Sequence, residues 1–190
     1  MAGVRPIEFD ADAALDAAMN TFWRHGYSGT NLPTLLKETG VARQSLYNTF
    51  GDKRQLFLKA VRLYSERQLA AHARKLGGDN PKDALEKFVN GWRHRRRRTA
   101  GRGCLVCLTM GEFSDQDPEV SRLVAEHTGK FTALLSERLR SAGAGRRADA
   151  LASGLVAMSF GIATLCRQPG TQPMIDDATD QALAMVRGAA

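Results

Sequence analysis

The side chains with the clearest chemistry lie on one side of a predicted helix that spans residues 42–50. In projection Leu46 and Phe50 share one side of this helix, and a polar set occupies the remainder: Arg43, Gln44, Ser45, Tyr47 and Asn48. Arginine can pair with guanine through two hydrogen bonds, glutamine and asparagine can do so with adenine, and hydroxyl groups can hold phosphate oxygens. Such a helix suits the major groove of DNA, although a plain solvated helix carries similar side chains.

The segments before this helix predict the frame that positions it. Residues 32–39 form a second short helix, with Thr30 or Asn31 as its cap and Pro33 in its first turn, where a missing N–H costs little. Gly40 permits the left-handed backbone of a tight turn. Two short helices joined by such a turn describe a helix-turn-helix.

Helical spacing dominates the whole chain, and no alternating strand pattern is found. We therefore predict an all-α fold of about nine helices, with an N-terminal three-helix helix-turn-helix domain and a C-terminal helical bundle. The predicted helices span residues 11–25, 32–39, 42–50, 52–74, 81–98, 103–113, 118–142, 146–167 and 174–187. The expected domains are residues 1–54, with the start of the connecting helix 52–74, and residues 55–190.

The 190-residue chain has a formal net charge of +7 and a pI of about 9.7, and such an excess points to an acidic partner, with nucleic acid first. By segment, the net charge is −1 for residues 1–50, +4 for residues 51–80, +5 for residues 81–100 and −1 for residues 101–190. The third segment owes its charge to Arg93 and to Arg95–Arg98. This run fits a solvated helix face, a source of long-range attraction to DNA, or a site for an anionic ligand.

The sequence carries only weak signs of export or membrane insertion. The first residues contain no apolar core of a secretory signal. The longest uncharged run, residues 150–166, is near the lower limit for a membrane span, but serine, threonine and glycine dilute it. We expect a packed internal helix there, no membrane partner and a cytoplasmic protein.

Cys104 and Cys107 are three residues apart, a spacing that places both sulfur atoms near one face of a helix. The pair could act as a thiol sensor of oxidants or electrophiles, or as half of a metal site. Zinc would need two further ligands and no matching pair stands in the sequence, so we predict no metal site and no cofactor. The simpler alternative is two small side chains that line a core or pocket, because free cysteine is commonly buried.

Aromatic and methionine side chains in the C-terminal half could line an apolar cavity for a small molecule, together with the two cysteines. The candidates are Phe88, Trp92, Met110, Phe113, Phe131 and Met158. Plain core packing explains residues at this spacing as well. The sequence leaves the chemistry of such a ligand open.

Residues 14–57 resemble the DNA-binding domain of TetR-family transcriptional regulators. The resemblance rests on Ala18, Phe22, Gly26-Tyr27, Thr30, Gly40-Val41, Leu46-Tyr47, Phe50, Lys53 and Leu56 in the spacing of the family. It implies base contacts from Arg43 and Gln44. It implies phosphate contacts from Thr30, Ser45, Tyr47, Thr49 and Lys53. The sequence departs from the family pattern at two positions. Ala42 stands where the family often has a Ser or Thr that caps the helix, a contribution of about 1 kcal/mol. Pro33 stands where some members have a polar side chain that contacts bases.

The resemblance also implies a homodimer with a variable C-terminal domain that binds a small-molecule effector. In the family the last two long helices build the dimer interface, here residues 146–167 and 174–187. On the first of these, Ser153, Ala157 and Gly161 recur every four residues and let another helix approach closely, either from a second subunit or within one chain. Two recognition helices in a dimer suit a palindromic operator in double-stranded DNA, with half-sites about one helical turn apart.

These observations predict a ligand-responsive transcriptional regulator, in the first place a repressor that an unidentified small molecule releases from DNA. One alternative is a redox-sensing regulator that acts through Cys104 and Cys107. Another is a helical small-molecule-binding protein or enzyme, but no nucleophile–base pair, phosphate loop or metal-ligand spacing stands out. We therefore expect a protein that is not an enzyme.

Overall fold

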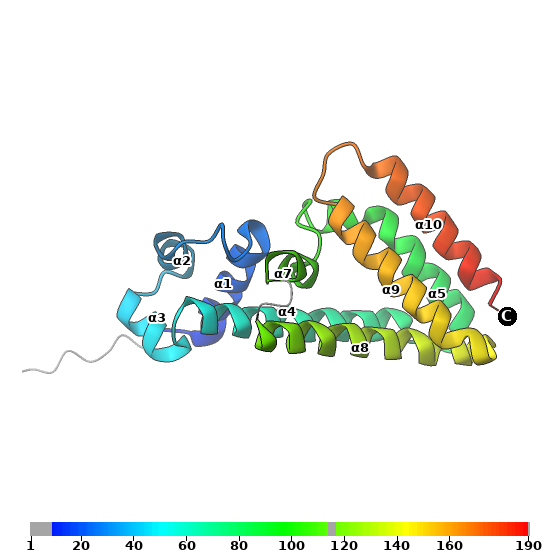
Figure 1. The fold of residues 1–190 in the computed structure, drawn as a ribbon, viewed down its shortest axis with the longest axis horizontal. Coiled ribbons are helices and arrows are strands. Elements are labelled where there is room, and N and C mark those ends of the chain that lie inside the picture. The colour runs from blue at the N-terminus through cyan, green and yellow to red at the C-terminus, as the bar shows by residue number, and fades with distance from the viewer. Residues whose placement is uncertain (1–8, 114–116, 190) are drawn as a thin grey trace, which may run out of the picture. The chain divides into compact units, whose positions relative to one another are not determined.

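The computed structural model describes residues 9–113 and 117–189, and all of its regular elements are helical, as predicted. The helices are α1 (Ala11–His25), α2 (Leu32–Thr39), α3 (Arg43–Phe50), α4 (Lys53–Leu76), α5 (Pro81–Asn90), α6 (Arg95–Arg98), α7 (Leu105–Phe113), α8 (Pro118–Ser141), α9 (Ala148–Leu165) and α10 (Gln172–Arg187). Short 3₁₀ turns at Gly91–His94 and Gly145–Arg147 precede α6 and α9. The chain forms two compact units, residues 1–63 and 64–190, so the division falls inside α4 (Figure 1).

The prediction of one helix over residues 81–98 is wrong. The α-helix ends at Asn90, a 3₁₀ turn follows, and α6 is a single turn of four residues. Gly91 lies at the break, and glycine is about 1 kcal/mol less favourable than alanine inside a helix. Trp92 in the 3₁₀ turn is buried, so packing of its indole accompanies the change of helix type.

In the N-terminal unit, α1 packs against α2 and aromatic side chains form the core. Phe22 and Phe57 are fully buried and meet edge to face, with ring centroids 5.0 Å apart. Tyr27 adds a third ring, 4.9 Å from that of Phe57. Asn31, rather than Thr30, caps α2: its side-chain oxygen accepts a hydrogen bond from the backbone N–H of Thr34 at 2.9 Å.

In the C-terminal unit, α8 and α9 pack along each other, while α10 lies against α5 and α9 (Figure 1). Apolar side chains from these helices form one core, whose fully buried members include Leu85, Phe131, Leu135, Leu139, Leu155 and Ile162. Full burial of a leucine or phenylalanine side chain contributes about 2 kcal/mol. This core therefore holds together helices that are far apart in the sequence.

One helical segment of the described chain, Gly145–Leu165, is long and apolar enough to cross a membrane by length and composition. Inside the C-terminal unit it packs against α8 and α10, and its buried residues belong to the core. That packing agrees with the predicted internal helix.

The loop before α7 gives a test of close packing in this unit. Gly103 has φ of +70°, and a Cβ added there would lie 2.3 Å from the carbonyl oxygen of Ala163. Gly103→Ala should therefore lower the free energy of unfolding by about 3 kcal/mol, since the left-handed backbone penalises a side chain and the carbonyl group leaves no space for it. Urea denaturation followed by circular dichroism measures this change.

Gly145 is the matched control, because it has φ of +53° but nothing within 4 Å of an added Cβ. Gly145→Ala should cost only about 1 kcal/mol, from the backbone conformation alone. Equal losses for the two variants would show that the contact with α9 is unimportant.

Candidate functional site

The helix α3 is oriented by the turn that precedes it and by two buried side chains. Gly40 has φ of +67°, and its N–H donates to the carbonyl oxygen of Leu36 at 3.0 Å. Leu46 is fully buried and Phe50 is 6% exposed, so the apolar side of α3 faces the core as predicted. Ala42 stands before α3 and supplies no side-chain cap, which confirms the expected departure.

The opposite side of α3 brings together most of the predicted DNA-reading set. Exposed are Arg43, Gln44, Asn48 and Thr49, and half-buried are Ser45 and Tyr47. Gln44 Nε2 donates to Asn48 Oδ1 at 2.9 Å, and the Arg43 guanidinium carbon lies 5.8 Å from the centre of the Tyr47 ring. These contacts restrict long side chains before any partner binds, which lowers the entropy lost on binding.

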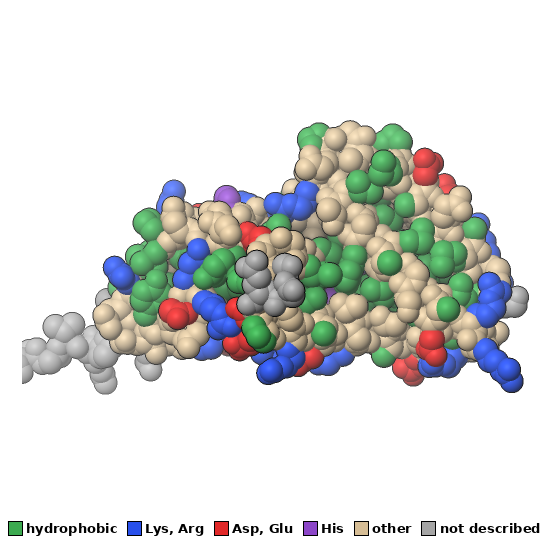
Figure 2. Space-filling model, viewed as in Figure 1, with side chains coloured by type: hydrophobic (Ala, Val, Ile, Leu, Met, Phe, Trp, Pro, Cys, Tyr) green, Lys and Arg blue, Asp and Glu red, His purple; other side chains and the backbone are tan. Residues whose placement is uncertain are grey.

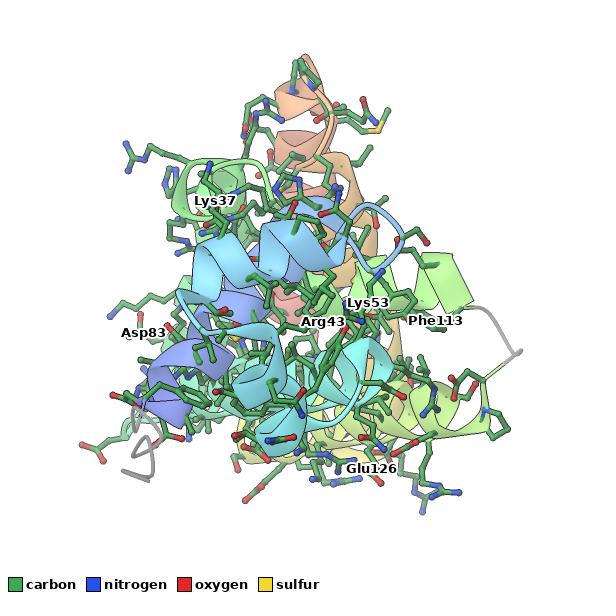
Figure 3. All side chains as sticks on the ribbon, turned by 90° about the vertical axis from the view of Figure 1, so that its left-hand side faces the viewer. Lys37, Arg43, Lys53, Asp83, Phe113 and Glu126 are labelled. Atoms are coloured by element: carbon green, nitrogen blue, oxygen red, sulfur yellow. The ribbon has the colours of Figure 1, made fainter. Side chains whose placement is uncertain are left out.

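Lys53 lies in the first turn of α4, where the helix dipole favours a phosphate group. Its Nζ is 4.2 Å from the centre of the Tyr27 ring, within range of a cation–π interaction. Figure 3 shows Lys37, Arg43 and Lys53 on the side of the N-terminal unit that faces the viewer. A positive side chain from each of α2, α3 and α4 therefore borders this surface.

Two residues differ from the sequence prediction. Thr30 is fully buried and its hydroxyl donates to the carbonyl oxygen of Gly26 at 2.6 Å, so the structure does not place this side chain with the exposed set. Lys59 was missed: its Nζ donates to the carbonyl oxygen of Thr49 at 3.4 Å, near the end of α3. The spacing of residues along α4 could not show which of its lysines meets α3.

The predicted ligand-lining residues separate by burial. Phe88, Trp92 and Phe131 are buried, Phe113 and Met158 are half-buried, and Met110 is 42% exposed. The ring centroid of Phe88 lies 6.0 Å from that of Trp92 and 6.1 Å from that of Phe131. Three of the candidates thus form an aromatic cluster inside the C-terminal unit, whereas α7 directs Met110 outward and corrects the prediction that it lines an interior cavity.

Polar side chains share this interior, which the sequence analysis did not predict. Ser65 Oγ and His127 Nδ1 lie 2.8 Å apart, and the His72 ring stacks on that of Phe131 at 4.5 Å. Burial, and then the positive charge of Arg95, lower the pKa of His72 to about 3 and that of His127 to about 4. Both imidazole rings are therefore neutral at neutral pH.

Cys104 immediately precedes α7 and is 4% exposed, and Cys107 is half-buried. A hydrogen bond from the Cys107 thiol, aided by the positive charge of Arg95, lowers the pKa of Cys104 to about 6 although burial opposes ionisation. The same hydrogen bond and burial raise the pKa of Cys107. One thiol thus ionises readily beside another that keeps its proton. No group of three His, Cys, Asp or Glu side chains in the described part of the chain could hold a metal ion.

Only part of the arginine run is solvated, which was one of its predicted roles: Arg97 and Arg98 are exposed. Arg95 is only 8% exposed. Its neighbours bond within the unit: Arg93 to Asp180, Arg96 to the carbonyl oxygens of Cys166 and Gln168, and Arg98 to the carbonyl oxygen of Gly91. The run is thus divided between side chains bonded within the unit and exposed ones.

The predicted interface residues lie on the outer side of α9. Ser153, Ala157 and Gly161 are exposed, so they do not pack within the C-terminal unit. On α10, Met174 is 58% exposed. Figure 2 shows apolar side chains over α9 and α10 on its visible face. This surface is suited to contact with another helix pair.

Comparisons with known proteins identify the family. Residues 14–60 match the bacterial regulatory proteins of the tetR family, and residues 81–181 match the C-terminal domain of LmrA/YxaF-like transcriptional regulators. The chain belongs to the TetR family of transcriptional regulators. It is therefore a DNA-binding regulator and not an enzyme, and both the predicted family and the predicted fold class are confirmed.

Named relatives include repressors. The uncharacterized HTH-type transcriptional regulator YezE of Bacillus subtilis (strain 168) is 38% identical over 120 residues, which cover 60% of each chain. The HTH-type transcriptional repressor ComR of Escherichia coli (strain K12) is 44% identical over 72 residues, 38% of this chain and 34% of its own. The matched stretches thus span less than two thirds of these relatives.

A solved structure covers more of the chain. It is a cysteine mutant of the TetR-family regulator CifR, complexed with 26-bp double-strand operator DNA. The two chains are 26% identical with a TM-score of 0.80, and the match covers 95% of this chain and 98% of that one.

The neutral histidines predict a loss of stability in acid. The unfolded chain protonates each ring near pH 6.5, whereas the folded chain does so near pH 3 for His72 and pH 4 for His127. Between these values the unfolded state binds more protons, so stability is complete above about pH 6.5 and falls as the pH is lowered. The free energy of unfolding should decrease by about 1.4 kcal/mol per pH unit for each histidine in that window.

Urea titrations at several pH values between about 4.5 and 7 measure this slope. His72→Phe should reduce it, whereas His94→Phe, at an exposed position outside the interior, should leave it unchanged. An unaltered slope in His72→Phe would assign the acid sensitivity to other groups.

Proposed function

We propose that this protein is a cytoplasmic, ligand-responsive transcriptional repressor that binds a palindromic DNA operator as a homodimer and is released by a small molecule. The observation that carries this proposal is the exposed polar face of α3, with Arg43, Gln44 and Asn48 held outward by burial of Leu46 and Phe50. The repressor relatives and the operator-bound CifR support it.

On DNA, α3 enters the major groove. Arg43 pairs with guanine, and the hydrogen-bonded Gln44 and Asn48 read adenine. Ser45, Tyr47, Thr49 and Lys53 hold phosphate oxygens and set the register of the helix. Pro33 lies exposed at the start of α2 and has no N–H to donate, so α2 contributes little to base reading.

Dimerisation uses the outer faces of α9 and α10. The small side chains of Ser153, Ala157 and Gly161 allow the partner subunit's helices to approach closely, and the apolar surface of α10 extends the contact. An interface between two copies of the same surface has twofold symmetry, which matches a palindromic operator.

The effector binds in the C-terminal unit and acts by differential affinity. It favours a dimer whose two α3 helices are wrongly spaced for successive major grooves, so its binding energy shifts the population away from DNA. Phe88, Trp92 and Phe131 supply an apolar environment for such a ligand.

A second candidate function, compatible with the first, is thiol-based sensing by Cys104 and Cys107. The Cys104 thiolate attacks hydrogen peroxide, which gives a sulfenic acid and water once the leaving hydroxide is protonated. The Cys107 thiol then displaces that hydroxyl group as a second water, so two thiols and one peroxide become one disulfide and two waters. The low pKa of Cys104 beside a protonated Cys107 favours this candidate.

Selection of bound sequences from a random DNA pool tests the main proposal, and a palindrome is expected. On the selected site, Arg43→Ala should lose about 1–3 kcal/mol of binding free energy and relax the preference at one base pair. Lys53→Ala should weaken binding to all sequences alike. It should also reduce the slope of log affinity against log salt concentration by about one, the value for one phosphate contact. Fluorescence anisotropy at several salt concentrations measures both effects.

Arg62→Ala, at an exposed position on α4, is the control and should change neither quantity. Absence of any enriched sequence would contradict the proposal. Equal losses for Arg43→Ala and Lys53→Ala on operator and random DNA would contradict the assigned roles.

For the thiol candidate, hydrogen peroxide should release the wild type from its operator, and the double variant Cys104→Ala, Cys107→Ala should stay bound. The control Cys166→Ala, which removes a third buried thiol, should respond as the wild type does. Equal release of the double variant and the wild type would exclude sensing by this pair.

A further inference from the structure

Arg95 is a buried cation in the C-terminal unit, 8% exposed. Its Nη1 donates to both the carbonyl oxygen and the hydroxyl oxygen of Ser159, at 3.0 and 2.9 Å. Within the described residues, neither Nε nor Nη2 makes a hydrogen bond and the guanidinium takes part in no ion pair; neither nitrogen is among the fully buried atoms that lack a partner, so both stay accessible. The guanidinium is planar and carries five N–H donors. One of its edges is thus fixed on α9, while the other edge makes no hydrogen bond to the described residues.

Among the described groups around Arg95, the Cys104 thiol is the one that can supply a negative charge. Tyr64 stays protonated because burial raises its pKa, and His72 and His127 are neutral. Lys75 and Arg98 add further positive charge nearby. The Cys104 thiol is the anionic candidate on α7, and its charge is already shared with the hydrogen bond from Cys107. Taking a guanidinium out of water is unfavourable without an anionic partner, and the Cys104 thiolate offers it only a charge divided with the Cys107 hydrogen bond, so a bound anion can take this place.

A second polar atom of the same interior also lacks a partner. His72 Nδ1 is buried and makes no hydrogen bond to the described residues. The His72 ring lies between aromatic neighbours, 4.5 Å from the Phe131 ring centre and 5.2 Å from that of Phe88. An uncommitted guanidinium edge, an unpartnered imidazole nitrogen and an aromatic wall therefore occur in one part of the unit.

We propose that the effector of this regulator is an aromatic carboxylic acid that Arg95 recognises. The carboxylate accepts two parallel hydrogen bonds from Nε and Nη2, and the ring of the ligand lies against Phe88, Phe131 and the imidazole of His72. A singly charged carboxylate suits this apolar interior better than a doubly charged phosphate, because desolvation rises steeply with charge. This inference rests on the proposed response to a small molecule and adds the chemical class of that molecule.

The test compares acids with their uncharged amides, using the full chain without DNA. The probes are benzoate, 2-naphthoate and 4-phenylbutyrate, each paired with its amide, and calorimetry gives the affinities. At least one acid should bind the wild type about tenfold more tightly than its amide. Arg95→Met should bring that ratio close to one, whereas Arg95→Lys should keep part of it. Arg97→Met, at an exposed position on the same helix, should preserve it.

Thermal unfolding of the free protein separates recognition from a structural role. Arg95→Met loses the two hydrogen bonds to Ser159 but also removes the desolvation cost of a buried charge, so it should be about as heat-stable as the wild type. If Arg95→Met does not fold, Ser159→Ala replaces it. Loss of one of the two hydrogen bonds that orient the guanidinium should weaken binding of the acid severalfold and leave that of the amide unchanged.

The proposal is overturned if no acid is preferred to its amide, or if the preference is undiminished in Arg95→Met or in Ser159→Ala. Because the assay contains no DNA, this result leaves the operator selection untouched. Conversely, failure of the operator selection would not alter the measured preference for acids.

Discussion

The exposed polar face of α3 depends on the burial of Leu46 and Phe50 in the N-terminal unit. With 3.6 residues per turn, two inward side chains at this spacing force Gln44 and Asn48 to the opposite side of α3. Gly40 determines where α3 begins, and the buried side chains determine its rotation about its own axis. The chemistry of the exposed face thus follows from packing, and a change in the core would displace all of its polar side chains together.

In the C-terminal unit the same packing collects polar groups from α4, α6, α8 and α9. His72 and His127 lie among aromatic rings and Arg95 is buried, although buried ionisable groups weaken a core. Apolar replacements of similar volume would serve stability better. Natural proteins accept such costs chiefly at functional sites, which is why this interior, rather than the apolar part of the core, is informative about a ligand.

Local signals predicted much of the fold. Asp10, Asn31 and Gly40 mark helix ends by their own hydrogen-bonding and backbone preferences, so residues 11–25 and 32–39 were found without tertiary information. The break at Gly91 was missed because continuous helical spacing does not reveal where packing of Trp92 favours a 3₁₀ turn. The buried Arg95 was missed for the same reason: its surroundings are made by helices distant in the sequence, and five arginines in six positions suggest a solvated surface.

Arg95 connects the two proposed signals. Its positive charge favours the Cys104 thiolate, and it is also the group that would accept a carboxylate. A bound acid places a second negative charge beside the same guanidinium, and like charges at short range raise the pKa of the thiol. On these proposals the ligand-bound regulator has a less reactive Cys104 than the free one. Effector binding and oxidation then oppose each other. The carboxylate bound to Arg95 lowers the fraction of Cys104 that is ionised, and an oxidant reacts with the ionised form.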